Sequence, residues 1–291
     1  MTGEKVNENI YQKNTAMPDF KLSAAQIAAY KKDGYLIVKD FLKAEEIKKL
    51  QTIAFEDGAM RRHAFDLNDQ TGKKTKLTLW YKPGNDAYGL LTRSRKMIDS
   101  VNELMDGGAE VCHFHSKLMQ KEPKVGGAWE WHQDYGYWYK NEFLFPEQMM
   151  SVMIAITDAS KANGCLQVIK GSHKMGRIEH GFAGEQVGAA QLYVDLALKT
   201  MELVYVELKA GDALFFHSNI LHRSEANLSD KPRWSIISVY NRASNIPYNE
   251  PSQSSTVPVE AVPDEALLQW KEETITEAAN FLEKEKDEAL K

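Results

Sequence analysis

The sequence predicts a mainly β protein with helices, of the α+β class, in which N-terminal helices brace a double-sheet jelly roll. Two observations support this prediction. Short apolar segments of strand length, separated by turns, fill the chain from Val111 onward, whereas helical patterns gather before that residue. The strands expected in this region are Val111–Met119, Met149–Thr157, Cys165–Ile169, Leu203–Leu208, Ala213–His217 and Trp234–Tyr240.

The region before Val111 combines helices with short strands. Ser23 is a suitable N-cap for a helix through Tyr30, and Gly34 is expected to end that helix. Residues 61–76 are polar and charged, which predicts a mobile loop. The other elements expected here are strands at Tyr35–Val38 and Leu77–Tyr81 and helices at Lys43–Phe55 and Arg95–Met105.

Turn and helix signals organise the rest of the chain. Asn163-Gly164 is a two-residue hairpin signal, and the segment Phe182–Thr200 reads as an inserted helix or lid. A C-terminal amphipathic helix is expected from Asp264, with apolar residues at helical spacing: Leu267, Leu268, Ile275, Ala278, Ala279 and Leu282. The predicted organisation is a flexible arm (1–20), one large domain (21–250) and a C-terminal linker with a helix (251–291).

Composition narrows the class of function. The chain has 291 residues, 43% apolar and 26% charged, which is typical of a globular protein. Two cysteines cannot form a disulfide framework, so a reducing, cytoplasmic setting is expected. The polar N-terminus predicts no signal peptide, and no apolar stretch approaches the roughly 20 residues that span a membrane. A net charge of −5 without a basic stripe argues against nucleic acid and favours a small-molecule substrate.

Three residues form a candidate metal site. In an extended segment, His132 and Asp134 would share one face, because alternate residues of a strand point the same way. A third ligand must come from a distant strand, and His222 follows the apolar strand Ala213–His217. Two imidazoles and one carboxylate are the facial triad of non-haem Fe(II) oxygenases. Eleven residues beyond His222 lies Arg233, whose planar guanidinium suits a buried carboxylate.

Several motifs occur together in an order and spacing that resemble one enzyme family. They are His132-Gln133-Asp134, Asn163-Gly-Cys-Leu166, Gly171-Ser-His173, Phe215-Phe-His217, His222 and Arg233. The chain resembles the phytanoyl-CoA dioxygenase family of Fe(II)- and 2-oxoglutarate-dependent oxygenases over roughly residues 25–250. The resemblance does not extend to the C-terminal helix.

The resemblance implies a double-stranded β-helix, the cupin-like form of the jelly roll. It also implies Fe(II) on His132, Asp134 and His222, and 2-oxoglutarate on Arg233, with help from Ser224 and Lys117. The reaction would use O₂, release succinate and CO₂, and hydroxylate a small organic substrate. Related halogenases have a small residue in place of Asp134, so this carboxylate favours hydroxylation. Some members have Trp where Met153 stands.

Other histidines and aromatic residues leave alternatives open. His113 and His115 could be ligands in a cupin-like metal enzyme of another reaction type, although a pocket or core position is the more common role. The hydroxyls of Tyr135 and Tyr137 and the ring of Trp138 could contact substrate or could simply pack. The second alternative is a non-catalytic jelly-roll protein that binds a small ligand. Loops are expected at His180 and a turn at His173, and His217 could be buried or could orient a ligand.

Overall fold

The computed structural model describes residues 20–56, 58–141, 143–183, 185–248, 255–271 and 281–282. Its α-helices are α1 (Ala24–Asp33), α2 (Ala44–Glu56), α3 (Gly58–Arg62), α4 (Ala87–Thr92), α5 (Arg95–Leu104), α6 (Asp134–Asn141), α7 (Gln191–Thr200) and α8 (Ala266–Gln269). The strands up to the second cysteine are β1 (Tyr35–Val38), β2 (Phe65–Asn68), β3 (Lys74–Trp80), β4 (Val111–Lys121), β5 (Trp129–His132) and β6 (Met149–Ala155). Those after it are β7 (Leu166–Ile169), β8 (His180–Ala183), β9 (Gln186–Ala189), β10 (Leu203–Val206), β11 (Ala213–His217), β12 (His222–Ser224) and β13 (Arg233–Arg242).

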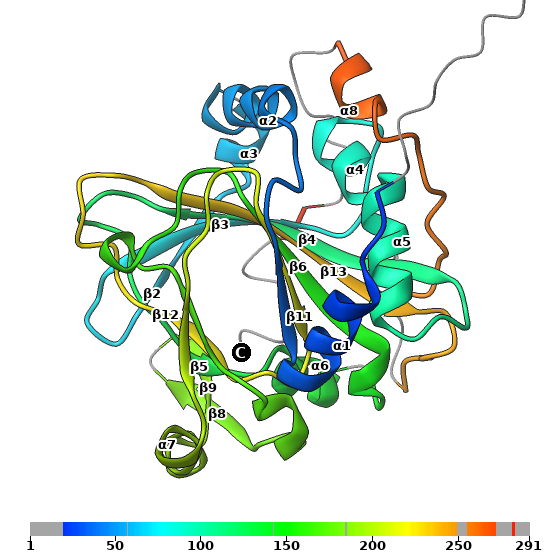
Figure 1. Ribbon diagram of the computed structural model, residues 1–291. Coiled ribbons are helices and arrows are strands. Elements are labelled where there is room, and N and C mark those ends of the chain that lie inside the picture. The colour runs from blue at the N-terminus through cyan, green and yellow to red at the C-terminus, as the bar shows by residue number, and fades with distance from the viewer. Residues whose placement is uncertain are drawn as a thin grey trace, which may run out of the picture.

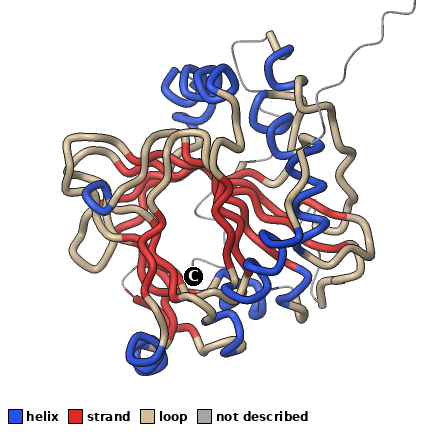
Figure 2. The backbone as a smooth tube through the Cα atoms, in the orientation of Figure 1, coloured by secondary structure: helices blue, strands red, loops and turns tan. Residues whose placement is uncertain are grey.

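Two antiparallel sheets form the predicted jelly roll. The large sheet has the order β1-β11-β6-β13-β4-β3-β2, and the small sheet has the order β10-β7-β12-β5. The sheets face each other in Figures 1 and 2, and α1, α4 and α5 lie beyond the large sheet, on the side away from the small one. The hairpin β8–β9 forms a separate pair. None of the described helices is long and apolar enough to cross a membrane.

Strand alternation gives the large sheet two different cores. On β6, Val152 and Ile154 pack outward with residues of the helices, including Leu50 of α2 and Val101 of α5. The residue between them, Met153, packs inward with side chains of the small sheet. Because successive strand residues point to opposite faces, one strand serves both layers. The inner layer lies between the sheets and holds the candidate site.

The first predicted helix is confirmed in its details. Ser23 caps α1 through a capping box with Gln26, and Gly34 adopts a left-handed backbone with φ +81° at its end. A Cβ on residue 34 would meet the ring of His173 at 2.3 Å. Glycine is therefore required at this position both by conformation and by the close approach of His173.

Two predictions about loops are wrong. Residues 61–76 contain the end of α3, all of the edge strand β2 and the start of β3, and a turn joins the two strands at residues 69–73. The segment Asn163-Gly164 does not make a hairpin: β6 and β7 belong to different sheets. Instead, Asn163 closes a capping box with Ser160, and Gly164 ends a short 3₁₀ helix, so the chain crosses between the sheets.

The predicted insertion Phe182–Thr200 is the β8–β9 hairpin followed by α7, so its helical part is confirmed only from Gln191. The predicted C-terminal helix begins as α8 but ends at Gln269, where Trp270 turns extended with φ −64° and ψ 126°. The ammonium of Lys49 lies 5.7 Å from the Trp270 ring. Ile275, Ala278 and Ala279, and residues 1–19 of the predicted arm, lie outside the described residues.

A buried ion pair joins α2 to α5 behind the large sheet. Lys96 Nζ donates to both carboxylate oxygens of Glu46, at 2.9 and 3.0 Å. Both side chains are at least nine-tenths buried. Neither charge can be solvated if its partner is removed.

We expect Glu46→Ala to lower the free energy of unfolding by about 3–5 kcal/mol, because it leaves the Lys96 charge buried alone. The double variant Glu46→Leu/Lys96→Met should recover much of this loss, since it removes both charges. Chemical denaturation of the three proteins measures the difference. A loss below about 1 kcal/mol in the single variant would contradict the burial argument.

Candidate metal centre

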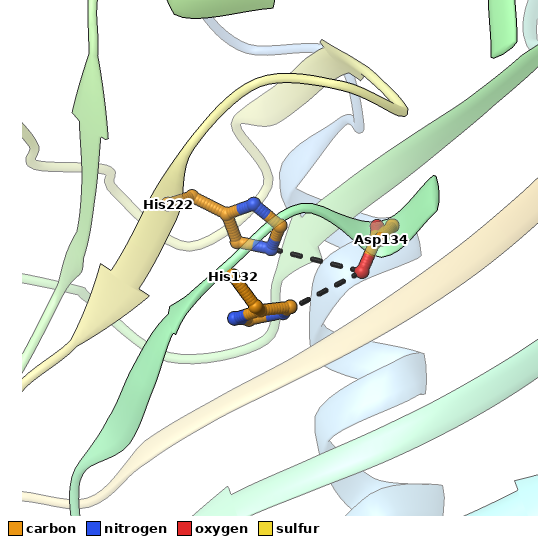
Figure 3. A group of neighbouring side chains, drawn as sticks. All are labelled: His132, Asp134 and His222. Carbon is orange, nitrogen blue, oxygen red and sulfur yellow. Dashed lines mark ion pairs between the residues drawn. The ribbon is translucent and has the colours of Figure 1, made fainter. Parts of the chain in front are cut away.

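The structure brings His132, Asp134 and His222 together at the inner side of the small sheet. His132 is the last residue of β5 and His222 the first of β12, and the two are direct partners in the antiparallel ladder. Their Nε2 atoms lie 3.6 and 3.7 Å from Oδ1 of Asp134. Figure 3 shows the three side chains converging on one point, and their ligand atoms all lie within 4.8 Å of one another.

Asp134 reaches this point by a different local structure from the one predicted. The strand ends at His132, and Asp134 is the first residue of α6 rather than a strand residue. The carboxylate nevertheless points toward the His132 ring. The two side chains meet through the start of a helix, whereas the sequence argument placed both on one strand.

The protons of both imidazoles are directed away from the centre. His132 Nδ1 lies 2.7 Å from the Glu130 carbonyl oxygen, and His222 Nδ1 lies 3.0 Å from that of Ile220. Since a carbonyl only accepts, each Nδ1 carries a proton, and each Nε2 faces the centre. Burial lowers the pKa of His222 to about 3, so this imidazole is neutral at pH 7.

Asp134 is held ionised with one oxygen free. Burial alone would raise the pKa of this carboxyl, but the neighbouring His222, His132 and Lys117 outweigh burial and hold the pKa well below its usual value. Ser151 Oγ donates to Asp134 Oδ2 at 2.6 Å. The hydroxyl therefore occupies one oxygen, and Oδ1 remains to face the imidazoles.

The turn between the two ligands is tied to the segment before β8. The backbone N–H of Gln133 donates to His180 Nε2 at 2.9 Å, and His180 Nδ1 lies 2.7 Å from the Ile178 carbonyl oxygen. The Gln133 side chain donates to the carbonyls of Gly176 and Asn219 and accepts from the Ile178 N–H. His180, expected in a loop, is thus the first residue of a strand and supports the metal turn.

This donor set fits Fe(II). Two imidazoles and one carboxylate, all buried, would occupy three positions of an octahedron and leave the others for small ligands. Among the described residues no other cluster of His, Cys, Asp or Glu has such geometry. His113 and His115, the alternative ligand pair, are separated by Phe114, which is an unpaired bulge in β4. His113 Nε2 lies 2.8 Å from Ser116 Oγ, inside the core.

A second polar group lies along the inner face of the large sheet. Arg233 and Lys121 are direct partners across β13 and β4, and both are buried. Arg233 Nη1 donates to Ser235 Oγ at 3.3 Å, whereas its Nε has no hydrogen-bond partner among the described residues. Lys121 Nζ donates to Ser224 Oγ at 2.8 Å and to the Glu225 carbonyl at 2.6 Å.

These two buried basic side chains are suited to bind an anion. Burial lowers the pKa of Arg233 to about 10, and burial, together with the Arg233 charge, holds the pKa of Lys121 well below its usual value. Neither side chain makes an ion pair within the described ranges. A carboxylate between them would supply the missing partner. Sequence reasoning missed Lys121, although its inward position follows from the alternation Lys117, Met119, Lys121 once β4 is extended by two residues.

The other residues predicted for the co-substrate and substrate sites lie in different positions. Lys117 lies over the ring of Trp129 at 5.8 Å. Tyr137 packs 5.6 Å from the His132 ring, and its hydroxyl donates to the Val187 carbonyl. Trp138 lies 6.2 Å from His115. The hydroxyl of Tyr135 is bonded to the Phe143 carbonyl, so this residue acts in the fold.

His173 and His217 lie away from the metal ligands. His173 Nε2 lies 3.2 Å from the Lys31 carbonyl oxygen, and the ring packs against Gly34. His217 Nδ1 accepts the Asn219 backbone N–H at 3.0 Å. The Asn219 carbonyl in turn accepts from Gln133, so His217 supports the metal turn through one intervening residue.

Comparison with known proteins gives one family and one fold. The family model of phytanoyl-CoA dioxygenase matches residues 30–235. An ectoine dioxygenase of Bordetella parapertussis is 24% identical over 238 residues, 77% of each chain. L-proline trans-4-hydroxylase of Streptomyces griseoviridis is 26% identical over 235 residues, 75% of this chain and 86% of that protein. The crystal structure of EctD from S. alaskensis with bound Fe shares the fold, with a TM-score of 0.67, 21% identity and 85% and 90% of the two chains covered.

We expect Ser151→Ala to weaken metal binding about 10–100-fold, because residues that orient a ligand carboxylate typically have effects of this size. Co(II) titration followed by absorbance measures affinity without turnover. Ser100→Ala is the matched control, since Ser100 is also buried and bonds a backbone carbonyl, but on α5. Equal affinities in wild type and Ser151→Ala would show that the hydroxyl does not orient Asp134.

Proposed function

Because the chain belongs to the phytanoyl-CoA dioxygenase family of Fe(II)- and 2-oxoglutarate-dependent oxygenases, we propose that it hydroxylates a small organic molecule and releases succinate and CO₂. One observation carries this proposal. A three-ligand metal centre and a buried guanidinium lie on facing sheets of one jelly roll. A keto acid that chelates the metal and places its distal carboxylate on the guanidinium would use both.

His132, Asp134 and His222 would hold Fe(II), each through one atom. Bound Fe(II) supplies the activation of O₂ that couples decarboxylation of 2-oxoglutarate to oxidation of the substrate. The protein contributes the geometry. The Nδ1 bonds fix the imidazole rings, and Ser151 keeps Asp134 to one coordinating oxygen. The buried surroundings keep bulk water from the reacting atoms.

Arg233 would bind the distal carboxylate of 2-oxoglutarate, joined by Lys121. Its unpaired Nε and its inward position on β13 support this role. Ser224 would act through Lys121, since its hydroxyl already accepts from that ammonium. The arrangement sets the direction of the co-substrate, with the keto end at the small sheet and the distal end at the large one.

Tyr137 and Trp138 would border the substrate. Tyr137 packs on the ligand His132, and Trp138 lies beside His115 on the inner face. The named relatives act on ectoine and on L-proline, which supports a small substrate here as well.

We expect the Fe(II)-loaded protein to release succinate from 2-oxoglutarate, slowly alone and faster with substrate. Asp134→Ala should abolish this release, because one of three metal ligands is lost. Quantifying succinate by mass spectrometry is the direct measurement, and circular dichroism confirms that the variant is folded. Stoichiometric iron without turnover of any keto acid would refute the proposal.

Arg233→Met should weaken the binding of 2-oxoglutarate by about 2–5 kcal/mol, or roughly 30-fold or more in affinity, because a buried charge-assisted contact is lost. Affinity for the metal should stay unchanged, because Arg233 does not touch the ligands. Arg223→Met is the matched control, as Arg223 pairs with Glu225 near the surface. Calorimetric titration of the Co(II)-loaded protein with 2-oxoglutarate measures the effect. Unchanged affinity would place the co-substrate elsewhere.

A further inference from the structure

The helix α7 carries apolar side chains on its exposed face. Successive helix residues are rotated by about 100°, so the buried residues Val194 and Ala197 lie on one side, and Leu192 and Leu196 lie on the opposite side. These two leucines are 65% and 47% exposed. A surface helix normally has polar residues at such positions, whereas a helix that is apolar all round is normally covered. The exposed face of α7 therefore indicates a packing partner on this side.

Two aromatic residues extend this apolar surface. Tyr193, which follows Leu192 on α7, is 48% exposed, and Phe182 on β8 is 69% exposed. Phe182 and Gln191, the first residue of α7, line the same hollow, so the hairpin and the helix form one continuous surface. Figure 1 shows α7 at the outer edge of the molecule, next to β8 and β9. We call Phe182, Leu192, Tyr193 and Leu196 the α7 patch.

The size of the α7 patch fits an interface between two copies of the chain. A large apolar side chain has roughly 200 Å² of surface when fully exposed, so these exposed fractions correspond to about 450 Å² per copy. Two facing patches would bury about 900 Å² of apolar area. Since interfaces are roughly 60% apolar, the whole contact would reach about 1,500 Å², which is the standard size of a stable interface.

The charged residues of α7 suit an antiparallel pair of helices. Asp195 and Lys199 are exposed, lie about one turn apart and flank the two leucines. If two copies of α7 pack antiparallel about the level of Ala197, each Asp195 lies opposite Lys199 of the second copy. A parallel pair would instead bring like charges together, which is unfavourable. Charge complementarity therefore favours a second copy of α7 in the antiparallel direction.

The buried face of α7 lies behind the metal ligands. Ala197 belongs to one apolar cluster with Trp131 and Leu221. These two residues directly precede His132 and His222 and point to the outer side of the small sheet, because strand residues alternate. A second copy that holds α7 in place would therefore also support the strands that carry both histidines.

We propose that the chain forms a symmetric dimer in which the α7 patches of two copies face each other and the two α7 helices run antiparallel. Such a contact uses the same surface on both copies, so the assembly closes at two chains. The interface lies on the opposite side of the small sheet from the metal centre. It therefore goes beyond the proposed function and does not depend on the reaction.

Sedimentation equilibrium of the full-length chain over the micromolar range tests this interface. The variant Leu192→Glu/Leu196→Glu introduces charges at the centre of the α7 patch, and Leu192→Met/Leu196→Met keeps that centre apolar. Ile246→Glu is the matched control, because Ile246 is 70% exposed but lies after β13, outside the α7 patch. Circular dichroism of each variant verifies that it is folded.

The wild type should sediment with twice the chain mass of 33.0 kDa. Leu192→Glu/Leu196→Glu should weaken the dimer about 100-fold or more, because like charges meet where apolar contact is lost. The methionine variant and Ile246→Glu should remain dimeric. The melting temperature of the wild type should rise with protein concentration, whereas that of the glutamate variant should not.

Exchanging the charges of α7 tests the antiparallel direction. Asp195→Lys places lysines opposite each other and should weaken the dimer about three- to tenfold, an effect that high salt reduces. Asp195→Lys/Lys199→Asp restores both ion pairs and should recover the wild-type affinity. A double variant as weak as Asp195→Lys alone would contradict the antiparallel pairing.

Three further outcomes overturn the inference. A wild type with the mass of one chain at the highest concentration would refute self-association. A dimer that is lost in Ile246→Glu but kept in Leu192→Glu/Leu196→Glu would place the interface elsewhere. A mass that grows beyond two chains with concentration would indicate an open, head-to-tail contact instead of a closed pair.

Discussion

The antiparallel pairing of β12 with β5 is the contact on which the site depends. It places His222 directly opposite His132, so two imidazoles from distant parts of the chain meet at one rung of the ladder. A slip of one residue would turn either side chain to the other face of the small sheet. The neighbouring pairing of β12 with β7 holds the strand from its other edge and makes such a slip more costly. The relative position of the two histidine ligands is therefore set by the register of the small sheet.

The large sheet supplies the polar groups that face this centre. Its inner face is mostly apolar, yet Ser151, Lys117, Lys121 and Arg233 all point inward from β6, β4 and β13. They divide the inner layer into two ends, with the Asp134–Ser151 contact at one and the Arg233–Lys121 pair at the other. A co-substrate with an acid group at each end matches this spacing of charge.

The turn between the metal ligands gains its rigidity from outside the jelly roll. His180, at the start of β8, accepts the Gln133 N–H, and its ring fills the space beside Gly136, where a Cβ would lie 2.2 Å from the ring. The hydroxyl of Tyr137 bonds the other strand of the same hairpin at Val187. The β8–β9 hairpin thus acts as a brace for the ligand turn. Its role explains why a short, separate pair of strands lies next to the small sheet.

Some features follow from short-range physics and could be read from the sequence. The cap of α1 by Ser23 and the left-handed end of that helix at Gly34 follow from neighbours in the chain. The four residues His132, Asp134, His222 and Arg233 were recognisable because their chemical types and spacing are unusual together. Tertiary structure decided the rest. Whether Asn163-Gly164 closes a hairpin or crosses between sheets depends on where β7 finds a partner. The convergence of Asp134 through a helix start, and the pairing of Lys121 with Arg233, arise from contacts between segments far apart in sequence, for which no local pattern carries a signal.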